Sequence, residues 1–85
     1  EGGQAEQARY ALLYSEALDK NHIKVTNDSL IRQAWSHYKH HPKDLRRQCK
    51  TLYYWGRVKL RAGDKPGALR LFLEIEEKLK DTNEP

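Results

Sequence analysis

The chain has 85 residues, which fits a single small domain near the lower size limit for independent folding. Hydrophobic residues make up 38% and charged residues 33%, so we expect a helical domain with a thin core. No segment approaches the ~18 apolar residues of a membrane span. A net charge of +4 falls short of the dense basic character of a dedicated nucleic-acid-binding protein. The chain begins at Glu1 without any methionine, so we expect it to be a piece of a longer protein.

Two helices are predicted in the first half of the chain. Residues 4–20 are rich in alanine, leucine, glutamate and glutamine, which favour a helix. Four N-cap candidates at residues 26–29 predict a second helix over residues 27–40, and Pro42 ends it. The positions predicted to be buried are Ala8, Ala11 or Leu12, Ser15, and Leu18 or Asp19 in the first helix, widened by Leu13 and Ala17, and Leu30 or Ile31, Ala34, Trp35 and Tyr38 in the second.

Residues 43–62 and 64–80 predict two further helices that fold back on each other. Gly63 suits the left-handed position after a helix, and Asp64 suits the N-cap of the next one. Gly56 lies mid-helix, where glycine costs roughly 1 kcal/mol relative to alanine, so we expect a neighbouring helix to approach it closely. The positions predicted to be buried are Leu52, Trp55, Gly56 and Leu60 in the third helix and Ala68, Leu71 or Phe72, Ile75 and Leu79 in the fourth.

The spacing of small and aromatic residues in this hairpin resembles the tetratricopeptide repeat, a pair of antiparallel helices of about 34 residues. The resemblance implies two repeats, an atypical first one over residues 4–41 with a longer loop and a second one over residues 43–80. The fold class that follows is all-α, with two antiparallel helix hairpins stacked as a fragment of a right-handed solenoid. The residues that carry the pattern are Gly56, Ala68 and Phe72 in the second repeat and Ser15, Ala34 and Tyr38 in the first, while Lys59, Ile75 and Lys80 depart from it.

Longer phrases are similar to tetratricopeptide proteins common in Bacteroides and its relatives. These phrases are ARYALLYSEALDKNHI, TNDSLI, LYYWGRV and FLEIEEKLKDT, which together cover much of the chain. The resemblance implies a binding or scaffolding segment of a sensor or regulator. Members of that group often carry a lipoprotein signal or membrane segment, so a membrane-anchored or periplasmic parent is the expectation, with a cytoplasmic one as the alternative.

Two groups of residues could carry chemistry, and for each a structural interpretation is favoured. His37 and His41 share a helical spacing that zinc sites use, with His40 between them, but no cysteine or carboxylate stands at ligand spacing beside them. Cys49 follows Arg46 and precedes Lys50, cations that would favour its thiolate, but a buried structural thiol is the better interpretation. No catalytic motif is present, so we expect neither an enzyme, a metal site nor a cofactor.

A second stripe on the third helix combines cations with aromatic rings. Cations pair with an acidic or C-terminal carboxylate while rings shield the contact from water, so such a stripe can bind a partner peptide. A solvated basic face, with the tyrosine rings partly packed on neighbouring residues, is slightly favoured over groove binding. The stripe contains Lys50, Tyr53 or Tyr54, Arg57 and Arg61, and the tetratricopeptide resemblance adds Arg9, Leu12 and Glu16 of the first helix to the same groove.

Three functions compete on this evidence. The favoured one is a non-catalytic protein-interaction module that binds a peptide or partner domain in a helical groove. The second is nucleic-acid contact through the cations of the third helix, which would make affinity fall with salt. The third is an architectural or self-associating segment, in which Leu69 and Leu73 contact a further helix. The cations of the second hypothesis are Arg46, Arg47, Lys50, Arg57 and Arg61.

Overall fold

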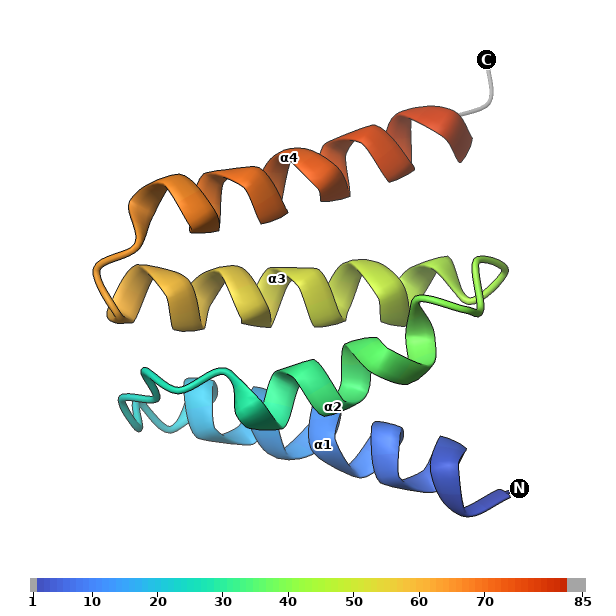
Figure 1. The fold of residues 1–85 in the computed structure, drawn as a ribbon, viewed down its shortest axis with the longest axis horizontal. Helices are drawn as coiled ribbons and strands as arrows, with labels where there is room; N and C mark the ends of the chain where they lie inside the picture. The colour runs from blue at the N-terminus through green and yellow to red at the C-terminus, as the bar shows by residue number, and fades with distance from the viewer. Residues whose placement is uncertain (1, 83–85) are drawn as a thin grey trace.

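A computed structural model describes residues 2–82, and this part of the chain contains four helices and no strand. The helices are α1 (Gly2–Lys20), α2 (Ser29–Tyr38), α3 (Leu45–Arg61) and α4 (Lys65–Thr82). Figure 1 shows them as two antiparallel hairpins, α1 with α2 and α3 with α4. The predicted all-α class with two hairpins is therefore confirmed, while the right-handed solenoid and the division into repeats stay predictions.

The predicted cap residues set the ends of α3 and α4. The Asp44 carboxylate accepts a hydrogen bond of 3.4 Å from the Arg47 amide and starts α3. Gly63 adopts φ 85°, the left-handed conformation that a residue without Cβ reaches easily. The Asp64 carboxylate then accepts a bond of 3.0 Å from the Gly67 amide at the start of α4. The first and last residues of α3 and of α4 all lie within two residues of the predicted bounds.

α2 begins two residues later than predicted because a side chain closes the turn before it. The Asn27 carboxamide oxygen accepts a bond of 2.8 Å from the Ser29 amide. Asp28 occupies the N-cap position, but its side chain makes no capping bond. The Asp28 carboxylate is therefore available for contacts with another helix.

The core of the first hairpin contains three alanines, which let α1 and α2 approach closely. Two residues that were predicted to widen the buried face of α1 lie outside the core, because Leu13 is 56% exposed and Ala17 is also exposed. Trp35, predicted to be buried, is only partly so. The buried cluster contains Ala8, Ala11, Leu12, Ile31, Ala34, Tyr38 and, from α3, Tyr54.

Gly56 and Phe72 form the close contact between α3 and α4 that the mid-helix glycine predicted. A Cβ atom added at Gly56 would lie 2.7 Å from the Phe72 Cζ and closer still to its Cε1. The aromatic ring therefore fills the space that a side chain at Gly56 would need. The predicted burial of Leu60 and Leu79 is wrong, since they are 41% and 50% exposed.

Polar residues take part of the interior that was predicted to be apolar. Gln48 is 2% exposed, and its side-chain amide donates a bond of 2.8 Å to the Tyr38 carbonyl at the end of α2. Thr51 is fully buried and donates a bond of 2.6 Å to the Arg47 carbonyl within its own helix. Both side chains are thereby satisfied, which burial in a small core requires.

α4 packs against α3, and its backbone approaches no other helix of residues 2–82. This agrees with the outer position of α4 in Figure 1. Its opposite side leaves Leu69 and Leu73 58% and 50% exposed, as predicted from their positions. One side chain reaches the first hairpin, because the Lys78 ammonium lies 5.9 Å from the centroid of the Trp35 ring. Across residues 2–82, none of the helices has the length and apolar character needed to cross a bilayer.

Candidate functional site

The cations of the predicted stripe join α3 to α1. The Lys50 ammonium lies 3.1 Å from a carboxylate oxygen of Glu16. Arg57 and Arg61 both reach the same Asp19 oxygen, at 3.2 Å and 2.8 Å. Three of the six residues predicted to bind a partner therefore bind carboxylates of the chain itself. Glu16 and Asp19 therefore offset part of the charge of these three cations before any partner arrives.

The two tyrosines of the stripe lie in different environments. Tyr54 is 8% exposed within the core, and burial raises the pKa of its phenol. Tyr53 is 44% exposed and makes an edge contact with Tyr54, with ring centroids 5.0 Å apart. Of this pair, only Tyr53 presents its ring to a molecule outside the chain.

The remaining predicted residue, Arg9, lies in a cavity between the middle of α1 and the N-terminal part of α3. Arg9 and Arg46 are exposed, and neither forms an ion pair within the described part of the chain. Arg47 at the same cavity pairs with Asp44 at 2.9 Å. We call this cavity of about 350 Å³ the basic groove, and its lining residues are Arg9, Leu12, Leu13, Arg46, Arg47 and Lys50.

The basic groove combines positive charge with an apolar floor. Four of its six lining residues are cationic, and none of the six carries a carboxylate. Leu12 is buried beneath them, whereas Leu13 is more than half exposed at the rim. Such a surface suits an anionic group that is attached to an apolar one, because each part finds a matching contact.

The histidine cluster lies at the end of α2. The rings of His37 and His41 are 4.2 Å apart, centroid to centroid. Burial and the neighbouring His41 charge lower the pKa of His37. Over residues 2–82, no group of three or more His, Cys, Asp or Glu side chains could hold a metal ion.

Cys49 is partly buried on α3. Burial raises the pKa of its thiol, and the Lys78 ammonium opposes this effect only in part. A nucleophilic cysteine needs the opposite shift, toward the thiolate at neutral pH. The environment is that of a structural thiol.

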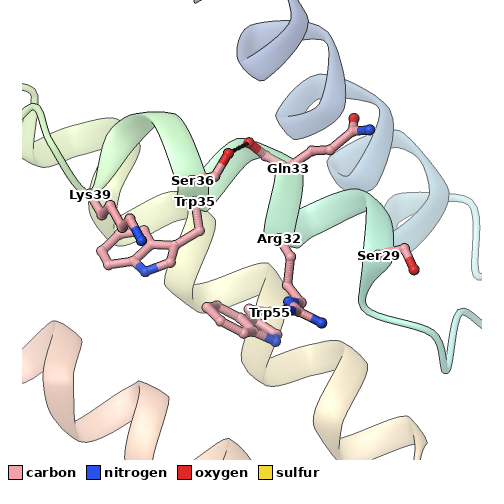
Figure 2. A pocket seen from close by; sticks show the side chains of 7 residues that line it. All are labelled: Ser29, Arg32, Gln33, Trp35, Ser36, Lys39 and Trp55. Carbon is pink, nitrogen blue, oxygen red and sulfur yellow. Dashed lines mark hydrogen bonds between the residues drawn. The ribbon is translucent and has the colours of Figure 1, made fainter.

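A second cavity, of about 530 Å³, was not anticipated from the sequence. We call it the tryptophan pocket, and Figure 2 shows its residues between α2 and α3. Both of its tryptophans were predicted to lie in the core. The sequence signal that could have indicated this pocket is the spacing of two cations around Trp35. Arg32 lies three residues before it and Lys39 four residues after it. Its lining residues are Ser29, Arg32, Gln33, Trp35, Ser36, Lys39 and Trp55.

Fold and surface together define a small all-α protein of two hairpins with a basic groove on one face. Comparisons of the chain with protein-family models, with curated proteins and with solved structures found no match. The basic groove and the tryptophan pocket are therefore the features of the chain that bear on its function.

Proposed function

We propose that the chain is a non-catalytic protein-interaction module of the tetratricopeptide type, which binds an acidic peptide segment in the basic groove. One observation carries the proposal: the groove gathers Arg9 and Arg46 without ion-pair partners over a leucine floor. A partner with carboxylates next to an apolar side chain would complement both features.

The peptide-binding positions differ from those expected from the sequence. Lys50 lines the groove with Glu16 beside it, so it contributes only part of its charge. Arg57 and Arg61 hold Asp19 and stabilise the pairing of α1 with α3. The proposed contacts are therefore Arg9, Arg46 and Leu13, with Tyr53 further along the exposed side of α3.

The experiment is a selection from a random peptide library displayed on phage, followed by affinity measurements on the enriched peptides. We expect enriched peptides to combine Asp or Glu with a large apolar residue. The double variant Arg9→Glu/Arg46→Glu should bind these peptides with at least tenfold lower affinity. Within residues 2–82 these two arginines hold no carboxylate, so their reversal breaks no ion pair there.

The matched control is Lys65→Glu/Arg70→Glu, which changes the net charge by the same amount on exposed positions of α4. The proposal is supported if the peptides bind this control with the same affinity as the unsubstituted chain and do not bind the groove variant. Equal losses in both variants would show that only net charge matters. Enrichment without acidic residues would contradict the proposal directly.

A further inference from the structure

The tryptophan pocket shares no residue with the basic groove, so a second ligand could be bound there independently. Figure 2 shows that the side chains of Arg32, Trp35 and Lys39 leave α2 on the side that faces Trp55. Positions 32, 35 and 39 follow the three- and four-residue spacing of one helix face. The pocket therefore presents two indole rings and two cations together.

Each ring contacts a charged group of the chain before any ligand arrives, and the Trp55 ring is held by a hydrogen bond. The Trp55 Nε1 donates a bond of 3.1 Å to the Asp28 carboxylate, which fixes the tilt of that ring. The Trp35 ring has the Lys78 ammonium over it at 5.9 Å. Rings that are already ordered lose little conformational entropy when a flat group stacks on them.

The charge of the pocket favours an anionic ligand. Arg32 and Lys39 are exposed, and none of the lining residues carries a carboxylate. Of the two, Arg32 forms an ion pair with Asp28, at 3.9 Å. Asp28 is shared with the Trp55 indole and with Lys59 at 3.8 Å, so its negative charge is offset locally.

A ligand that uses every part of this surface is anionic and also carries flat rings. We propose that the tryptophan pocket binds single-stranded nucleic acid, with bases stacked on Trp35 and Trp55 and phosphates paired with Arg32 and Lys39. Non-sequence-specific single-strand sites combine these two elements, aromatic platforms and a cationic path for the backbone. A proline-rich peptide would use the rings without the cations, and a duplex would hide the faces of its bases.

The test uses the intrinsic fluorescence of the chain, because Trp35 and Trp55 are its only two tryptophans. Short oligothymidylate and oligouridylate should each quench this emission on binding, and the two arms distinguish a DNA from an RNA source. Two phosphate contacts predict that affinity falls roughly 7-fold between 50 and 200 mM salt. Arg32→Glu/Lys39→Glu should weaken binding at least tenfold, whereas Lys24→Glu/Arg70→Glu, with the same charge change, should not.

Four outcomes would overturn the proposal. The first is no quenching by either oligonucleotide, and the second is an equal loss of affinity in the two charge-reversal variants. The third is equal quenching by inorganic polyphosphate, which has charge but no rings. The fourth is quenching by an uncharged proline-rich peptide at least as strong as that by the oligonucleotides. Circular dichroism of each variant confirms that it is folded before titration. Because the basic groove is unaltered in these variants, the outcome is independent of the proposed peptide binding.

Discussion

The Trp55 indole on α3 donates its only N–H to the carboxylate of Asp28, 27 residues earlier at the start of α2. This bond crosses between the two hairpins at a partly buried position. The same carboxylate lies near Lys59 of α3. Asp28 therefore links the beginning of α2 to the middle of α3, and it orients a ring of the tryptophan pocket.

Replacing Asp28 with alanine should destabilise the chain by about 1–2 kcal/mol, because the indole donor loses a charged acceptor. Urea denaturation followed by circular dichroism measures the change. Glu74→Ala on the exposed side of α4 serves as the control and should change stability by less than about 0.5 kcal/mol. If Asp28→Ala behaves like this control, the bond contributes nothing to folding.

The contact between Gly56 and Phe72 predicts that Gly56→Ala destabilises the chain by about 1–3 kcal/mol, because the new methyl group overlaps the Phe72 ring. This direction opposes helix propensity, which favours alanine over glycine by roughly 1 kcal/mol. The double variant Gly56→Ala/Phe72→Leu should lose less than the sum of the two single variants, since the smaller side chain makes room. Urea denaturation of all four chains completes the cycle. Stabilisation by Gly56→Ala would show that the ring moves aside freely.

Reversing the charges of Lys50 and Arg57 should lower the stability of the fold, whereas reversing the charges of Arg9 and Arg46 should not. Lys50→Glu/Arg57→Glu places two new carboxylates against Glu16 and Asp19 and should cost about 1 kcal/mol of stability. Arg9→Glu/Arg46→Glu should stay within about 0.5 kcal/mol of the parent chain. Thermal unfolding at low salt compares the two. Equal stability of both variants would show that the α1–α3 ion pairs contribute little.

The lowered pKa of His37 predicts a pH dependence of stability near neutrality. Burial, followed by the His41 charge, disfavours the protonated ring in the folded chain. Below pH 6.5 the unfolded chain therefore binds more protons at this ring than the folded chain, so stability is full above that pH and falls as the pH drops through the folded pKa. Urea denaturation at pH 5 and pH 7.5 should show this fall, and His37→Gln should reduce it. An identical fall in the variant would assign the effect to other groups.

The ends of the helices could be predicted because the residues that set them act locally. Asp44, Gly63 and Asp64 satisfy backbone groups within three residues of themselves, so their effect is contained in a short window. The glycine–aromatic contact was also predictable, because a mid-helix glycine has few explanations other than close packing.

The faces of the helices were less predictable because neighbouring residues compete for the same side. Tyr53 and Tyr54 are about 100° apart on the helix, and only the position of α1 decides which ring enters the core. Leu13 and Trp35 have core-like character, yet each lies at the margin of its hairpin, where no further helix of residues 2–82 covers it. An apolar pattern cannot show where packing stops.

The ion pairs between α1 and α3 were beyond sequence reasoning. They join residues 34 to 42 positions apart, and nothing local indicates that Glu16 and Asp19 meet cations of α3. The sequence pattern of the basic stripe is compatible with a partner-facing or a solvated surface, whereas three of its cations pair with carboxylates of α1. The cations that have no such role lie elsewhere: Arg46 is about one turn before Lys50 on α3, and Arg9 is about two turns before Glu16 on α1.

The one-sided attachment of α4 makes it the part of the chain that can open without the rest. Its backbone rests on α3 alone, so its detachment leaves the α1–α2 hairpin and the α1–α3 ion pairs in place. Amide hydrogens of α4 should then exchange with solvent through a local opening that costs less free energy than global unfolding. A molecule that covers Leu69 and Leu73 would slow that exchange selectively in α4. This slowing would locate contact on the outer side of the helix even when affinity is too weak to isolate a complex.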